Sequence, residues 1–340
     1  MSDLHRSVDP VVARVVHRLH RRLVAEALAN VRPIRPEAPQ PLFPPRRRFL
    51  GPSLAERLTR VERALEVIGE TRVTDPVDGS VELTAETLCL LHGVVADRGV
   101  AEAGRLRTVP VGFEAGKRFG GAPVDELRPF VDRALRELDE TRVDGWVEAA
   151  ARAVARLLTI HPFSDGNGRV ARLVFHLEQR RSDPAALGPG VDLWAPWRRG
   201  YLDALRASDP TGSVDRFDVG DPTPFVEWAC ARAADGVELW AARIETVARL
   251  HERLADELPA AASSADSFDA AVAIAVAIDR NVTLSELDDL DVVGADGVAT
   301  SAESPTTSVN ALVSDRLLGW DPRGLLQPTD RLLTLLGAPR

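Results

Sequence analysis

A segment of twelve residues near the middle of the chain contains most of the side chains that could do chemistry. It holds one imidazole, one carboxylate, two glycines and two guanidinium groups, from His161, Asp165, Gly166, Gly168, Arg169 and Arg172. An imidazole can act as a general base, a carboxylate can bind Mg²⁺, and guanidinium groups bind phosphate. The set predicts phosphoryl or nucleotidyl transfer.

The sequence on either side predicts how these groups are positioned. Residues 146–160 are apolar nearly all round, which predicts a helix buried at the centre of a bundle. Pro162 disfavours the α conformation at His161, so this helix should end there and leave the imidazole at a turn. The glycines let the backbone approach an anion ahead of a second helix. Arg169 and Arg172 share a face near its positive end, and a bound polyphosphate would explain two cations there.

Three regions are expected along the chain. Residues 1–52 combine a basic amphipathic helix (8–29) with a linker containing seven prolines, residues 53–250 form a helical core domain, and residues 262–340 form a small module. We expect the basic helix to pack on the body or on a partner rather than on a membrane surface. Residues 108–121, with four glycines after a β-branched start, predict a short β-hairpin flap between helices.

Composition limits the class of protein. The 340 residues have a formal charge of −9, with 42 Lys and Arg against 51 Asp and Glu, and 45% are hydrophobic. No run of apolar residues is long enough to span a membrane. The first 60 residues are nonetheless strongly basic, so the rest of the chain is acidic and poorly suited to nucleic acid. Two cysteines in apolar runs favour a reduced, cytoplasmic protein, and arginine in place of lysine suggests a bacterial one.

The segment HPFSDGNGRVAR resembles the motif of the Fic family, HxFx(D/E)GNGRxxR, with every fixed position filled. TAETLCLLHGVV and AGRLRTVPV upstream, and YLDALRASDP and GDPTPFVEW downstream, are similar to other parts of that family, so the likeness covers about residues 80–245. It implies an all-α fold, a helical bundle with a short β-hairpin flap. It also implies a protein adenylyltransferase, which transfers AMP from ATP to a Ser, Thr or Tyr hydroxyl of a target protein.

The resemblance also assigns roles to single residues. It makes His161 the general base, Asp165 the Mg²⁺ ligand, and Phe163 a buried structural anchor. The phosphates of the co-substrate ATP would be held by Gly166, Asn167, Gly168, Arg169 and Arg172. The target peptide would lie along the flap at Val111, Gly112 and Phe113 as an added strand.

Taken one at a time, most of these residues have simpler explanations. His161 could interact with a helix dipole, Asp165 could cap a helix, and Arg172 could be a solvated helix residue. Only their combination makes coincidence implausible. Two alternatives for the whole protein stay open: transfer of another nucleotide or of phosphate, and a regulator or scaffold without catalysis.

Regulation and the C-terminal module are less well defined by sequence. Family members often carry an inhibitory helix with the pattern (S/T)xxxE(G/N), and only Thr223–Glu227 fits its first five positions, inside a predicted core helix. Inhibition would then come from an antitoxin-like partner or from a diverged helix, or be absent, and a dimer of the chain with itself is a further possible partner. Residues 262–340 are loosely compatible with a winged helix, yet they hold few basic residues, so we favour a degenerate, protein-contacting module over a DNA reader.

Overall fold

The computed structural model describes residues 9–28, 83–96, 100, 102–111, 121–143, 145–182, 190–191, 194, 198–208, 220–257, 267–279, 282, 284, 287, 290 and 305–336. The described part divides into two compact units. The motif unit contains residues 24–28 and 83–237, and the terminal unit contains residues 9–23 and 238–336. The predicted boundaries at 52, 250 and 262 stay predictions, and each unit is described by itself.

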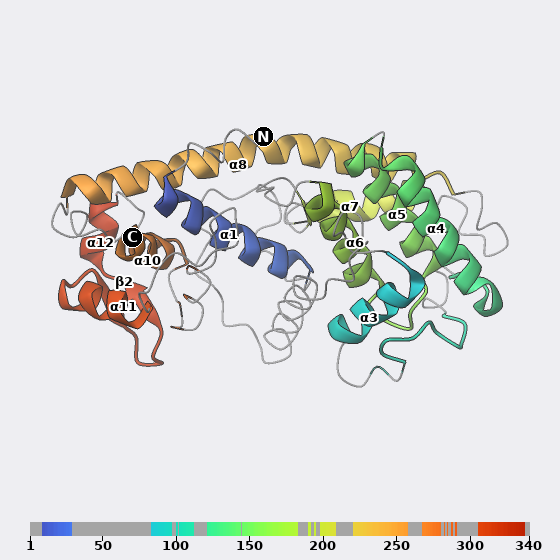
Figure 1. Cartoon of the computed structure of the whole chain (residues 1–340), viewed down its shortest axis with the longest axis horizontal. Helices are drawn as coiled ribbons and strands as arrows, with labels where there is room; N and C mark the ends of the chain where they lie inside the picture. Colours follow the sequence, from blue (N-terminus) through green and yellow to red (C-terminus); the bar gives the residue numbers. More distant parts are fainter. Residues whose placement is uncertain are drawn as a thin grey trace. The chain divides into compact units, whose positions relative to one another are not determined.

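The motif unit is a bundle of helices (Figure 1). It contains α3 (Ala85–Val95), the 3₁₀ helix η1 (Val124–Glu126), α4 (Leu127–Thr141), α5 (Trp146–Ile160), α6 (Asn167–Ser182), α7 (Arg198–Ser208) and the first part of α8 (Thr223–Glu257). The side chain of Thr84 accepts a hydrogen bond from the amide of Thr87, which caps α3 where the sequence predicted a helix start. The predicted all-α fold is confirmed for the described residues, whose only strands form one two-stranded sheet.

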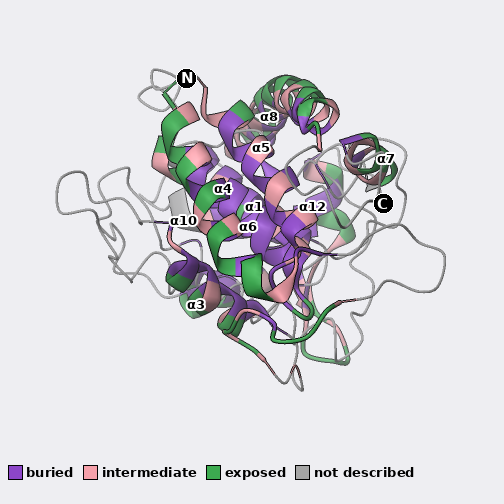
Figure 2. Cartoon of the chain, turned by 90° about the vertical axis from the view of Figure 1, so that its right-hand side faces the viewer, coloured by how far each residue is buried: buried purple, intermediate pink, exposed green. Residues whose placement is uncertain are grey.

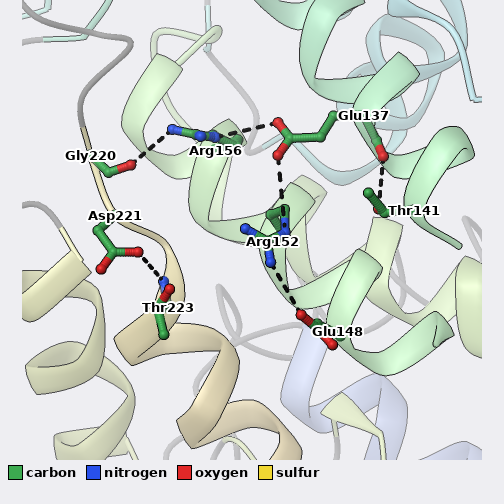
Figure 3. Close-up of polar contacts among 8 residues, drawn as sticks. All are labelled: Glu137, Thr141, Glu148, Arg152, Arg156, Gly220, Asp221 and Thr223. Carbon is green, nitrogen blue, oxygen red and sulfur yellow. Dashed lines mark hydrogen bonds and ion pairs between the residues drawn. The ribbon is translucent and has the colours of Figure 1, made fainter. Parts of the chain in front are cut away.

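Helix α5 lies at the centre of this unit, as its apolar sequence predicted (Figure 2). It packs against α4 on one side and α6 on the other. Its buried surface is rich in alanine, with Ala149, Ala150 and Ala153 among the contacts, and such small side chains let neighbouring helices approach closely. The exposed side of α5 carries Arg152 and Arg156, both of which pair with Glu137 of α4 (Figure 3).

An aromatic cluster joins the later helices of the motif unit. Trp194 contacts Phe175 of α6, Tyr201 of α7 and Phe225 and Trp228 of α8, at ring-centroid distances of 4.5–5.8 Å. The start of α8 is therefore part of the core. The residues Thr223–Glu227, which match the start of the inhibitory pattern, form the first turn of this packed helix, and Phe225 is fully buried there.

The terminal unit combines described residues from the first and the last parts of the sequence. It contains α1 (Pro10–Leu28) up to residue 23, the last part of α8, α10 (Ser267–Asp279), α11 (Pro305–Ser314), β1 (Leu318–Trp320), β2 (Leu326–Pro328) and α12 (Asp330–Leu335). The strands are antiparallel, and Val282 adds a single bridge to Leu326. Along the described residues, α10, the bridging residue Val282, α11 and the hairpin follow one another, and the expectation of a winged helix stays a prediction.

The basic N-terminal helix packs inside this unit. Its apolar positions, including Val11, Val15 and Leu19, are buried. Arg18 and Arg22 pair with the carboxylate of Asp279 at the end of α10, and all three side chains are at least nine-tenths buried. Part of the positive charge at the start of the chain is thus used within the fold. No described helix is long and apolar enough to cross a membrane.

Candidate active site

His161 lies at the junction that the sequence predicted, where α5 ends. It caps the helix in the left-handed conformation, with φ 52° and ψ 58°, and its amide donates to the carbonyl of Leu157. A positive φ is uncommon for any residue other than glycine and indicates a conformation that the surroundings must support. The turn takes the chain out of α5 at His161, and α6 begins six residues later at Asn167.

The imidazole of His161 is held in the form that a base requires. Nδ1 lies 3.3 Å from the carbonyl oxygen of Leu158, which can only accept a hydrogen bond, so Nδ1 carries the proton and Nε2 keeps its lone pair. Burial lowers the pKa of His161 below its usual value, and the positive charge of Arg107 acts in the same direction. The Leu158 carbonyl and the Asp165 carboxylate act in the opposite direction. The ring is therefore neutral near pH 7.

The loop after His161 is braced by its own side chains. The amide group of Asn167 accepts from the main-chain N–H of Phe163 at 2.9 Å and donates to the carbonyl of the same residue at 2.7 Å. Gly166 has a φ of 80°, which glycine adopts without strain. The amides of Asn167 and Gly168 open α6, and N–H groups in the first turn have no acceptor within their helix. This start of α6 is suited to an anion.

The two arginines of the motif lie side by side on α6, and both are buried. The guanidinium of Arg169 donates to the carbonyl of Val95 and, at 3.1 Å, to the carboxylate of Asp165. The guanidinium of Arg172 donates to the carbonyl of Leu28, at the end of α1, at 3.4 Å. Arg172 therefore contacts the N-terminal helix in the state described.

Asp165 is the only carboxylate of the motif, and its side chain is 60% exposed. The described residues contain no group of three or more His, Cys, Asp or Glu side chains that could enclose a metal ion. Mg²⁺ usually needs only one or two carboxylates when phosphate oxygens and water complete its shell. An exposed carboxylate beside an anion-binding helix start fits that arrangement, in which the nucleotide supplies the other ligands.

A second histidine, His92, was assigned no role from the sequence and is central to the site. It is fully buried on α3, its Nδ1 accepts from the amide of Gly104 at 3.0 Å, and its Nε2 donates to the carbonyl of Asp165 at 2.9 Å. Its ring stacks on Phe163 with centroids 4.0 Å apart. Phe163 is itself fully buried. The only sequence signal was a polar residue within the apolar run LCLLHGVV.

Other predicted residues contribute less to the observed site. Val111 is half-buried at the end of a described segment, while Gly112 and Phe113 lie outside the described residues, as does most of the predicted flap. Tyr201 belongs to the aromatic cluster. His176 is buried on α6, and burial lowers its pKa to about 4.

Comparison with known proteins identifies the region that contains this site. Residues 82–178 match the model of the Fic/DOC family. The chain is 29% identical over 167 residues to protein adenylyltransferase fic-1 of Caenorhabditis briggsae, an alignment that covers 48% of this chain and 30% of that protein. It is 32% identical over 114 residues to protein adenylyltransferase Fic of Culex quinquefasciatus, covering 30% of this chain and 20% of that protein.

The chain thus spans less than a third of the length of these relatives. Among solved structures, a Fic family protein from Desulfovibrio desulfuricans G20 is 20% identical, with a TM-score of 0.48, and the match covers 92% of this chain and 87% of that one.

Proposed function

We propose that this protein is a protein adenylyltransferase that uses ATP to modify a Ser, Thr or Tyr hydroxyl of a target protein, because residues 82–178 match the model of the Fic/DOC family. The observation that carries the proposal is the state of His161. The imidazole is neutral, its Nδ1 proton is directed to Leu158, and it stands at the end of α5 beside the glycine-rich start of α6. A general base and an anion site adjacent to each other are what nucleotidyl transfer requires.

These positions support the following reaction. Nε2 of His161 takes the proton of the target hydroxyl as its oxygen bonds to the α-phosphorus of ATP, the bond to the β-phosphate oxygen breaks, and pyrophosphate leaves. The amides of Gly166, Asn167 and Gly168 would stabilise the charge on the α-phosphate. Arg169 and Arg172 would hold the outer phosphates.

The residues present also fit a magnesium ion held by Asp165 and the phosphates of ATP. When bound, Mg²⁺ would offset negative charge on the phosphate oxygens. The Asp165 carboxylate now accepts from Arg169, so metal binding would compete with that contact.

The contact between Arg172 and Leu28 bears on regulation. A guanidinium that donates to the end of α1 is less available to a phosphate, so nucleotide binding would have to displace or share this contact. We propose that the N-terminal helix influences how ATP binds in this way. Two alternative sources of regulation are an antitoxin-like inhibitor and a second copy of the chain. Size-exclusion chromatography with light scattering would detect a dimer.

The experiment that tests the function uses two labels. Purified protein is incubated with a cell lysate and ATP labelled at either the α- or the γ-phosphate, and proteins are separated by electrophoresis. Label from α-ATP on protein supports adenylyl transfer. Label from γ-ATP alone would instead establish phosphate transfer, and binding of ATP without any labelling would favour a regulator or scaffold.

The variant His161→Ala should abolish α-label transfer while ATP binding, measured by calorimetry, stays within about twofold. His251→Ala is the matched control, because His251 lies on α8 in the terminal unit. Transfer that persists in His161→Ala would show that another group acts as the base.

A further inference from the structure

Arg107 is a buried arginine that makes several hydrogen bonds near His161. It lies between α3 and η1 in the sequence and is 2% exposed. Its three nitrogens donate to three main-chain carbonyls: Nε to His161 at 2.8 Å, Nη1 to Val109 at 3.1 Å, and Nη2 to Ala122. Its own amide donates to the carbonyl of Pro162 at 2.9 Å. One residue thus binds two consecutive carbonyls at the end of α5.

These hydrogen bonds lie where the backbone adopts an uncommon conformation. His161 is one of only two non-glycine residues with a positive φ in the described part of the chain. Such a conformation persists when neighbouring contacts determine it. The contacts on the His161 and Pro162 carbonyls fix both peptide planes that follow the imidazole-bearing residue, and therefore its direction.

The surroundings are shaped to admit the guanidinium. A Cβ atom at Gly121 would lie 2.7 Å from Nη2 of Arg107 and 3.0 Å from Cβ of His161, so only glycine leaves room for both. The amide of the next residue, Ala122, donates to the carbonyl of Ile160 at 3.0 Å. Two segments distant in sequence therefore meet at the end of α5 around a single side chain.

We propose that Arg107 is a positioning residue for the reaction: it holds the general base His161 in its left-handed conformation, so that Nε2 points at the reacting hydroxyl. The inference rests on the proposed function and adds a residue to it. Arg107 itself touches neither ATP nor target; it acts through His161.

Lysine could not take over this role. A guanidinium is planar and presents its donors in a fixed fork, whereas an ammonium group is a point charge on a flexible stem. Three carbonyls from three segments need the fork. Lysine would preserve the positive charge near His161 and lose the geometry, while glutamine would lose both. The two substitutions therefore separate position from charge.

The kinetic test compares Arg107→Lys and Arg107→Gln with Arg105→Gln, a control at an exposed arginine two residues away. A misplacement of a reacting group by about 1 Å can lower the rate about 100-fold. We expect kcat for AMP transfer to fall by about that factor in both Arg107 variants, with KM for ATP within about threefold and Arg105→Gln unchanged. A folded Arg107→Lys variant with unchanged kcat would overturn the proposal.

The pH profile adds a readout that a purely structural role would not move. Burial chiefly lowers the pKa of His161, and the charge of Arg107 adds to this, whereas the Leu158 carbonyl and Asp165 raise it. Removing the positive charge in Arg107→Gln should raise that pKa and move the acid limb of the kcat profile to higher pH. Arg107→Lys should leave the limb in place. The opposite pattern would contradict the proposal.

Hydrogen exchange tests positioning without activity. In the Arg107 variants, the amides of His161 and Ala122, which bond to Leu157 and Ile160, should exchange faster, while those in the middle of α6 should not. If the wild-type protein transfers no AMP but the Arg107 variants show this faster exchange, the proposed function fails and the positioning role stands. Unchanged exchange at both amides would overturn the positioning role whatever the activity.

Discussion

Buried arginines in the two units are held in different ways. Arg107 in the motif unit donates to three neutral carbonyls, whereas Arg18 and Arg22 in the terminal unit pair with the carboxylate of Asp279. A carbonyl satisfies a donor without cancelling its charge, so the charge of Arg107 still acts on the pKa of His161. A carboxylate cancels one positive charge. The same residue type thus lowers the pKa of a histidine in one unit and joins helices in the other.

Replacing Asp279 should lower the stability of the terminal unit, and we expect this substitution to have the largest effect. In Asp279→Ala, two buried guanidinium groups lose their carboxylate, and removing one partner of a buried pair costs about 3–5 kcal/mol. Urea unfolding followed by circular dichroism measures the loss. Asp315→Ala, at an exposed position, is the control. A loss below about 1 kcal/mol would mean that the pair does not hold α1 on α10.

In the motif unit, Asn167 is an uncharged buried side chain whose hydrogen bonds can be removed in the same way. Asn167→Ala leaves the N–H and the C=O of Phe163 without the side chain that binds both, and a buried group without a partner costs about 1–3 kcal/mol. We expect a loss of about 2–4 kcal/mol in urea unfolding. Asn310→Ala, at an exposed position on α11, should change stability by less than about 0.5 kcal/mol. Equal losses in the two variants would contradict the bracing role of Asn167.

His176 tests what happens when a buried side chain of the motif unit must gain a charge. Its pKa is lowered to about 4 in the folded protein, chiefly by burial, against an ordinary value near 6.5. Between these two pH values the unfolded chain binds the proton more tightly, so stability is complete above about pH 6.5 and declines as the pH falls towards 4.

Between pH 7 and pH 5, the His176 contribution to stability should fall by about 2 kcal/mol. The variant His176→Leu removes this contribution, so its unfolding free energy should decline less than that of the wild type over the same interval. Urea titrations at both pH values provide the comparison. Parallel declines would show that His176 is readily protonated in the folded state.

The smallest effect is expected where arginine and carboxylate meet at the surface. Glu137 lies 3.5 Å from Arg156 and 4.0 Å from Arg152, and all three side chains are about one quarter to one third exposed (Figure 3). Water and salt screen such pairs, so Glu137→Ala should cost less than about 1 kcal/mol. Thermal unfolding in low and in high salt checks this, and a loss comparable to that of Asp279→Ala would remove the distinction between buried and exposed pairs.

Much of the site was predictable because it is local in sequence. A stretch of the sequence from His161 to Gly168 contains the imidazole, the carboxylate and the glycines. Because Pro162 marks the end of α5, their order alone places an imidazole beside a helix start. The apolar pattern of residues 146–160 likewise predicted the central helix, whose observed bounds are the same. Short spacing and helical period are properties that a sequence displays directly.

The contributions of His92 and Arg107 could not be predicted in the same way. His92 reaches Asp165 across 73 positions, and Arg107 reaches His161 across 54. Both lie in segments that resemble other Fic proteins, but the resemblance assigns neither side chain a role. A buried histidine in an apolar helix and an arginine before a loop are each compatible with several roles, and only the packing of α3 and its following loop against the end of α5 selects one.

The sequence by itself determined which groups are available for chemistry: an imidazole, a carboxylate, a glycine-rich turn and two arginines, on a helical scaffold. The tertiary structure decided how these groups are held. It set the tautomer and lowered the pKa of His161, directed Arg107 to its carbonyl, placed Arg172 at Leu28, and turned the basic N-terminal helix into a partner of Asp279. The physical reason is that burial and hydrogen-bond partners depend on distances in space, which residues far apart in the chain acquire only when it folds.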